Sequence, residues 1–176
     1  LERLGGVDHA LVSERFFRAG LAADLAKASA TRVVAATLLP ATAVHAQTRA
    51  RATHTQIVGA SPELAALLGG ELDFVRAGPH PPAIVNRSLQ QQLGARVGDD
   101  LIVAFEREAA VPRESLFGRR ASSDVLQRLR LRLCRVVEDR DLGRFSLRPH
   151  QAQPLNLFVP LSDLQAALDL PGRANT

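Results

Sequence analysis

Residues 83–106 have the sequence AIVNRSLQQQLGARVGDDLIVAFE, and this stretch decides the fold class. The apolar run at 83–85 is typical of a short buried strand. Asn86 follows as a side chain that commonly caps a helix, and Gly94 suits the left-handed backbone that ends one. The stretch therefore predicts a strand that passes directly into a short helix at 88–93.

A second unit of the same kind lies upstream. Residues 43–61 are strand-like, with a reversal of the chain near Arg49–Ala50. Ser61 can cap a helix whose first residue is Pro62, because proline is tolerated at the first helical position. Gly69-Gly70 then ends this helix. Two strand-to-helix units indicate that strands and helices are interleaved along the chain.

Residues 126–137 permit two predictions. Leucines at 129, 131 and 133 alternate with arginines at 128, 130 and 132, which is the period of two of a half-buried strand. Leu126, Leu129, Leu133 and Val136 would also fit one face of a helix. The strand is favoured because the alternation is strict over six residues and two valines follow it.

The remaining elements complete an α+β fold of mixed βα units and long amphipathic strands. They are a helix at 8–28, a strand at 31–39 that Pro40 breaks or places at an edge, a strand at 101–106 after the turn at Gly98-Asp99, a loop at 138–148, a strand at 155–159, and a helix at 161–168 ended by Pro171-Gly172.

The charge of the chain does not indicate a nucleic-acid partner. The net charge is +4, but Lys27 is the one lysine among 22 basic residues, a bias typical of genome composition. Tyr and Trp, whose rings commonly stack on bases, are absent from the sequence. No apolar stretch reaches the roughly 20 residues of a spanning helix, and we expect no signal peptide in the first 20 residues.

No group of residues predicts a catalytic, cofactor-binding or metal site, so we expect that the chain is not an enzyme. Cys134 lies in an apolar run, where a cysteine is commonly a buried hydrophobe. His45 and His54 would face each other after the reversal, yet a metal needs three or four converging ligands. The acidic pairs and clusters at 99–100 and 138–141 fit turns and solvated loops, and no serine lies in a Gly-x-Ser-x-Gly elbow.

Four segments, taken in order, resemble the MacB-like periplasmic core domain of permeases in the macrolide-exporter and FtsX-like ABC transporter superfamily. The likeness covers about residues 30–176, although Ala60 stands where the family usually has Val and the Phe expected after Pro62 is missing. The segments are IVGASPE at 57–63, AIVNRSLQQQLGARVGD at 83–99, LCRVVED at 133–139 and LFVPLSDLQAAL at 157–168.

The resemblance implies an extracytoplasmic domain on the outer side of the cell membrane, placed between the first two spans of a permease. Its partners would be a cytoplasmic ATPase and a second permease subunit, in a homodimer or heterodimer, and it would bind no nucleotide. Residues 1–30 would be a helical lead-in from a span, and 31–176 the core domain. Two subdomains are implied, a porter-like lobe and a β-rich lobe, with an inserted lobe around 107–124. The alternative is a free-standing periplasmic binding or adaptor module.

Overall fold

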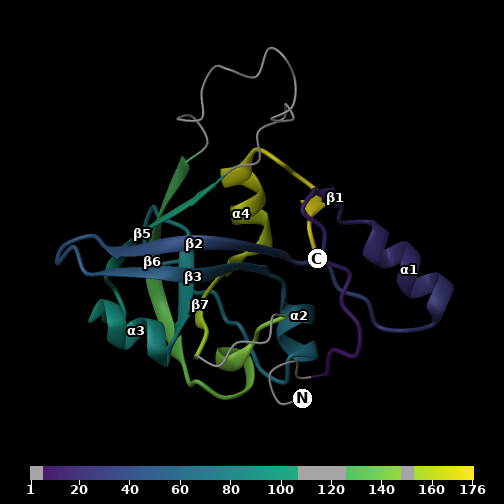
Figure 1. Cartoon of the computed structure of the whole chain (residues 1–176), viewed down its shortest axis with the longest axis horizontal. Coiled ribbons are helices and arrows are strands. Elements are labelled where there is room, and N and C mark those ends of the chain that lie inside the picture. Colours follow the sequence, from purple (N-terminus) through teal and green to yellow (C-terminus); the bar gives the residue numbers. More distant parts are fainter. Residues whose placement is uncertain (1–5, 107–125, 148–152) are drawn as a thin grey trace, which may run out of the picture.

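The computed structural model describes residues 6–106, 126–147 and 153–176 (Figure 1). The strands are β1 (Phe17–Arg18), β2 (Thr37–His45), β3 (Arg51–Ala60), β4 (Pro82–Asn86), β5 (Asp100–Glu106), β6 (Leu126–Val137), β7 (Leu155–Pro160) and β8 (Arg173–Ala174). The helices are α1 (Leu21–Ser29), α2 (Pro62–Leu67), α3 (Arg87–Leu93) and α4 (Leu161–Leu168), with a 3-10 turn, η1, at Asp141–Arg144. The predicted α+β class is confirmed.

Six strands close into a barrel in the order β2-β3-β7-β4-β6-β5. The pairs β3–β7 and β4–β6 are parallel, and the other four pairs are antiparallel. The segment at 126–137 is a strand, as the alternation favoured. Leu131 and Leu133 are buried, whereas Arg128 and Arg130 are exposed on the outer face. Closure removes the free sheet edges that would otherwise pair with other chains.

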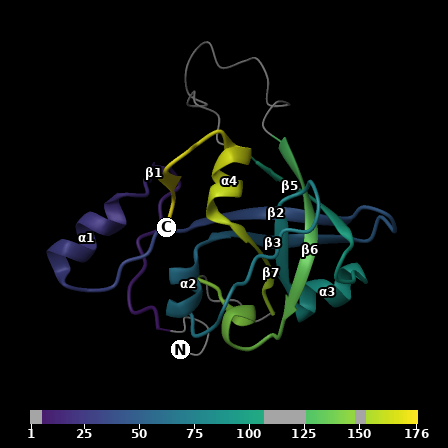
Figure 2. The same cartoon turned by 180° about the vertical axis from the view of Figure 1, so that it is seen from behind.

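The main core fills the barrel, and two helices contribute to it. Leu89 and Leu93 of α3 and Leu164 and Leu168 of α4 belong to the same buried cluster as the inward side chains of the strands. Helix α4 lies at the upper end and α3 at the lower end of the barrel in Figures 1 and 2. The interior is therefore packed with side chains.

A second core lies on the outer face of β3, β7 and β4. Val58, Phe158 and Ile84 point outward from these strands and pack with α2 and with the residues around η1. Their partners include Leu64, Ala65, Leu68, Leu142 and Phe145. The barrel thus has one wall covered by a second apolar layer.

The predicted helix caps are confirmed. The Leu64 N–H donates to the Ser61 hydroxyl oxygen over 3.4 Å, and the Leu89 N–H donates to Asn86 Oδ1 over 3.2 Å. Gly94 ends α3 in the left-handed conformation, with φ of 60°. These caps supply partners for backbone groups that a helix end leaves unpaired.

The N-terminal helix predicted for residues 8–28 is wrong in its first half. Helix α1 begins at Leu21, and Phe17-Arg18 instead forms β1, which pairs with β8. Residues 8–16 contain no helix. A local apolar pattern cannot anticipate this, because the partner strand lies at the other end of the sequence.

The strand predicted to begin at Thr31 begins at Thr37 and continues through Pro40 to His45. Pro40 lies just before Ala41, where the pairing of β2 with β5 begins. Pro40 therefore occupies an edge-like position of the sheet, which was one of its two predicted roles.

The inserted lobe expected around 107–124 lies outside the described residues. Within the described part of the chain, the structure contains one barrel, its covering helices and the small β1–β8 sheet. In this part of the chain, no helix is long and apolar enough to cross a membrane.

Candidate functional site

The expected pairing of His45 with His54 is wrong, although the chain does reverse near Arg49–Ala50. The turn follows His45 so closely that the His45 N–H donates to the Ala50 carbonyl over 2.9 Å. His54 lies four residues farther on, in an irregular stretch where the β2–β3 register shifts, and its side chain is exposed. No group of three potential metal ligands occurs among the described residues.

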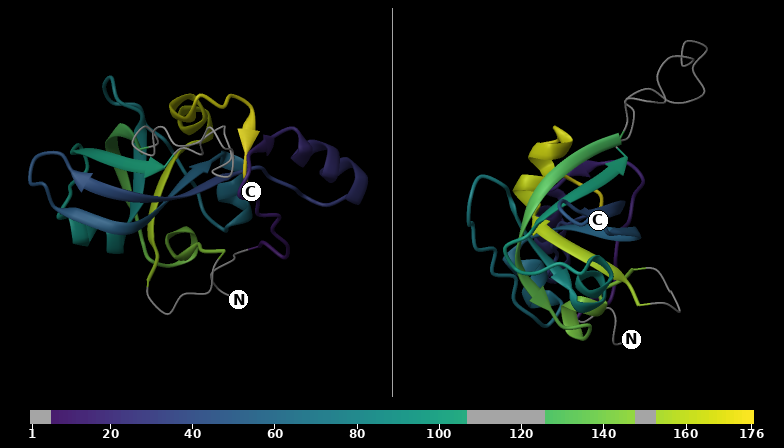
Figure 3. Two further views of the ribbon diagram at one scale, coloured as in Figure 1. Left: turned by 45° about the horizontal axis from the view of Figure 1, so that its top comes forward. Right: turned by 90° about the vertical axis from the view of Figure 1, so that its left-hand side faces the viewer.

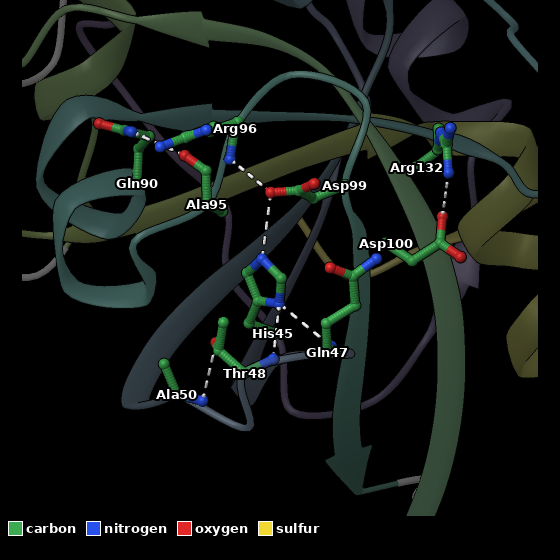
Figure 4. Close-up of polar contacts among 10 residues, drawn as sticks. All are labelled: His45, Gln47, Thr48, Ala50, Gln90, Ala95, Arg96, Asp99, Asp100 and Arg132. Atoms are coloured by element: carbon green, nitrogen blue, oxygen red, sulfur yellow. Dashed lines mark hydrogen bonds and ion pairs between the residues drawn. The ribbon is translucent and has the colours of Figure 1, made fainter.

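His45 instead meets Asp99, which lies in the turn before β5 (Figure 4). The ring is buried, and its Nε2 lies 3.1 Å from Asp99 Oδ2. Its Nδ1 accepts from the backbone N–H groups of Gln47 and Thr48 at 3.2 and 3.3 Å. The ring proton therefore belongs on Nε2, where it is donated to the carboxylate. Both ring nitrogens are used to hold the β2–β3 turn against the turn before β5.

Asp99 is held as a carboxylate by this arrangement. The Arg96 backbone N–H donates to Asp99 Oδ2 over 2.8 Å and is the main cause of the lowered pKa of Asp99. The hydrogen bond from His45 lowers the pKa further. A group with a lowered folded pKa stabilises the fold above its unfolded pKa, and that contribution disappears as the pH falls through the folded pKa.

Replacing Asp99 with asparagine should cost about 1 kcal/mol of unfolding free energy at pH 7, since two hydrogen bonds lose a charged acceptor. The difference from the unaltered chain should shrink as the pH falls below about 4, the ordinary pKa of an aspartate in the unfolded chain, and should disappear once the pH falls through the lowered pKa of folded Asp99. Urea unfolding at pH 7 and pH 3 measures both quantities, with the exposed Glu71→Gln as the control. A difference that persists unchanged at pH 3 would contradict this role of the charge.

Asp100 and Asp139 of the acidic clusters also have local partners, in keeping with the interpretation as turns and solvated loops. Asp100 accepts from Arg132 over 2.9 Å and pairs with Arg130 over 3.0 Å, and the Arg132 hydrogen bond is the main cause of its lowered pKa. Asp139 accepts from the backbone N–H and the hydroxyl of Ser88 at the start of α3. These carboxylates therefore brace the surface around β6 and α3.

Cys134 is half-buried, and its thiol donates to the Ala83 carbonyl over 3.2 Å. Burial raises the pKa of this thiol. A raised pKa disfavours the thiolate, which is the nucleophilic form. The interpretation of Cys134 as a small buried hydrophobe is therefore in keeping with its surroundings.

The feature that sequence reasoning missed is a junction of three segments. Residues 13–19 and 172–176 lie side by side, with Phe17 opposite Ala174 and Arg18 opposite Arg173 (Figure 1). The Ser13 N–H donates to the Asn175 carbonyl over 2.9 Å, and the Ala19 N–H donates to the Gly172 carbonyl over 2.8 Å. We call residues 13–19, 36–38 and 172–176 the flank junction.

Asn175 joins the flank junction to the barrel. Its Oδ1 accepts from the Leu38 N–H and its Nδ2 donates to the Leu38 carbonyl, both over 2.9 Å. Next to it, the backbones of Ala36 and Thr176 exchange hydrogen bonds of 2.8 and 3.0 Å. The Asn175 side chain thus pairs with the backbone of Leu38 as a neighbouring strand would. Leu38 lies in the first part of β2, and this part is not paired with β5, because the β2–β5 pairing begins at Ala41.

Asn175→Ala should cost about 2 kcal/mol, because the Leu38 N–H and carbonyl both lose their partner. Hydrogen exchange at the Leu38 amide should become faster, while exchange at the barrel amide of Val103 should change less. Arg173→Ala is the control, because Arg173 lies in β8, two residues before Asn175, and its side chain is exposed. Unchanged exchange at Leu38 would mean that Asn175 does not hold β2.

Comparison with solved structures shows which known fold this chain resembles. No family model matches the sequence, and no curated protein matches it. Among solved structures, the chain is similar to the periplasmic region of MacB from Actinobacillus actinomycetemcomitans, with a TM-score of 0.52 and 16% identity. The match covers 90% of this chain and 62% of that one. The chain has a MacB-like fold.

The MacB-like resemblance drawn from the four sequence segments is therefore confirmed at the level of the fold. The chain spans about three fifths of the MacB structure that it matches. Assignment to the FtsX-like group of permeases stays a prediction.

Proposed function

We propose that the chain is an extracytoplasmic domain of an ABC transporter permease of the FtsX-like type. It transmits the ATP-driven motion of transmembrane helices to export, lipoprotein release or envelope mechanotransmission. Its partners are a cytoplasmic ATPase and a second permease subunit, and the natural-length protein is attached to the membrane. The flank junction is the observation that carries this proposal, together with the MacB-like fold.

A domain that receives motion from two membrane spans needs both flanking segments at one place. Here β1 and β8 pair with each other, so the two flanks share one sheet. Asn175 then connects this sheet to β2 through two hydrogen bonds. Displacement of the flanks is thereby passed to the barrel backbone.

A packed barrel suits this task because packed elements move as a unit rather than deform. Leu89, Leu93, Leu164 and Leu168 anchor α3 and α4 in the interior. The His45–Asp99 contact braces the turn between β2 and β3 against the turn before β5. The domain can therefore shift as one body when its flanks move.

The test is to lock the flank junction with a disulfide in the natural-length protein. Arg18 and Arg173 are opposite one another, and the Ala19–Gly172 hydrogen bond next to them makes theirs the closer, non-hydrogen-bonded kind of pair. Such pairs have a Cα separation within the range of disulfides. The double variant Arg18→Cys/Arg173→Cys is made in a Cys134→Ser background, so that Cys134 does not compete for the disulfide.

Membrane vesicles that hold this protein and its ATPase are assayed for ATP hydrolysis and for substrate release. Oxidation should leave coupled activity unchanged, because the paired flanks already move as one sheet. Asn175→Ala should instead reduce coupled activity, because the two hydrogen bonds that connect this sheet to β2 are lost. A loss of activity on oxidation that dithiothreitol reverses would show that the flanks must separate, and would contradict transmission as one body. Each single-cysteine variant is the matched control. The proposal fails if the natural-length protein has no spanning helices, or if it does not co-purify with an ATPase. A free-standing periplasmic module would instead be recovered from the soluble periplasmic fraction.

A further inference from the structure

Helix α1 contains nine residues, none of which is fully buried, and two residues separate it from β1. It projects beside the barrel, next to the flank junction (Figures 1 and 3). An isolated helix of this length is marginal in water, since nucleation costs more than so few hydrogen bonds return. Leu21, Ala22 and Ala26 are half-buried and the other residues of α1 are exposed, so a further contact would stabilise this helix.

The side chains of α1 are divided into two faces. Leu21, Leu25 and Ala28 follow one another at the spacing of a helical stripe. Asp24 borders this stripe, and Lys27 lies farther round the helix. Leu25 is 41% exposed. In the segment before β1, Leu11 and Val12 are 59% and 57% exposed. Three of the six exposed large apolar side chains of the described residues thus lie within 15 residues of the chain.

Basic residues outnumber acidic ones in the segment that contains this apolar stripe. Arg18 pairs with Asp24, both on the surface. The positive residues of segment 11–32 outnumber the negative ones by four to two, being Arg15, Arg18, Lys27 and Arg32 against Glu14 and Asp24. A short apolar stripe with a positive surround is complementary to anionic lipid headgroups.

We propose that α1 is an interfacial helix that lies on an anionic phospholipid surface, with Leu21 and Leu25 in the headgroup layer. This inference rests on the proposed function, which places the flank junction, and hence α1, near a bilayer. A second copy of the chain fits less well. A stable protein interface takes about 20–30 residues from each side, and this stripe offers only a few.

The experiment holds the chain near a bilayer, as its membrane attachment would. The chain carries a C-terminal hexahistidine tag and is bound to vesicles that contain nickel-chelating lipid. An environment-sensitive nitrobenzoxadiazole label is placed at Ala28→Cys in the Cys134→Ser background. The vesicles contain phosphatidylcholine alone, or phosphatidylcholine with roughly a third phosphatidylglycerol.

The label at position 28 should shift its emission to the blue on the phosphatidylglycerol vesicles, and 0.5 M NaCl should weaken the shift by screening. Leu25→Asp should reduce the blue-shifted fraction of the label about tenfold, since a charged side chain replaces an apolar one that would be buried in the headgroup layer. Val97 is equally apolar and 62% exposed but lies before β5, so Val97→Asp is the matched control and should change nothing.

The inference is overturned if the label at position 28 shifts no more than the same label at Val97→Cys. It is also overturned if the shift appears without vesicles and grows with protein concentration, which would identify a second copy as the occupant. This outcome is separate from the proposed function. A lipid-dependent blue shift in a protein that has no ATPase partner would leave the lipid contact standing. A functional ATPase pair without this blue shift would remove the lipid contact alone.

Discussion

Asn86→Ala should destabilise the domain by about 3–6 kcal/mol, because it removes the centre of a buried polar cluster. Asn86 is fully buried at the end of β4. Its Nδ2 donates to the carbonyls of Gly143 and Pro154 over 2.9 and 2.7 Å. Its Oδ1 accepts from the backbone N–H groups of Leu89 and Asn156 over 3.2 and 3.1 Å.

Alanine would leave three of these backbone groups without a partner, since only the Gly143 carbonyl keeps a second donor, Asn156 Nδ2. Each buried unpaired group costs about 1–3 kcal/mol, and a domain of this kind has only about 5–15 kcal/mol in total. Urea unfolding followed by far-ultraviolet circular dichroism measures the loss. Gln91→Ala, on the exposed side of α3, is the control and should stay within about 0.5 kcal/mol. A loss below 1 kcal/mol at Asn86 would show that water replaces the amide.

Gly143→Ala should cost about 3 kcal/mol or more, because there is no space for a side chain at this position. A Cβ on Gly143 would meet the Glu138 carbonyl oxygen, a backbone atom that cannot rotate away. Relief would require η1 to move. The Gly143 carbonyl, which accepts from both Asn86 and Asn156, would move with it.

Gly20→Ala is the matched control for this prediction. Gly20 has nothing within 4 Å of an added Cβ, and its φ of −59° suits alanine. It should leave stability unchanged or raise it by a few tenths of a kcal/mol, because alanine reduces the freedom of the unfolded chain. Thermal unfolding of both variants compares the two sites directly. Equal melting temperatures would show that η1 gives way without cost.

Most of the local elements could be predicted because their signals are contained in short stretches. Ser61 and Asn86 bond to residues only three positions ahead, so a cap can be recognised from its own neighbourhood. The alternation at 126–137 likewise reflects which side chains face the core, and it decided correctly between strand and helix. The MacB-like fold could be inferred from such segments taken in order.

The contacts that matter for the proposed function could not be predicted in this way. His45 meets Asp99 because β2 and β5 are neighbours in the barrel, and the sequence distance between the two residues is 54. Asn175 meets Leu38 across 137 residues. Neither pairing can be predicted from nearby residues, because the sequence around a polar side chain does not indicate which distant residue it contacts.

The flanking segments show this division most clearly. The sequence by itself determined the βα units around Asn86 and Ser61, because helix caps, glycine stops and alternating side chains act over a few residues. Only the tertiary structure decided that Phe17-Arg18 is a strand rather than part of a helix, because its partner, β8, lies at the other end of the chain. Hydrogen bonds of Ala36 and Leu38 to residues 175–176 hold the start of β2 next to the C-terminal segment, and that long-range placement is what creates the flank junction.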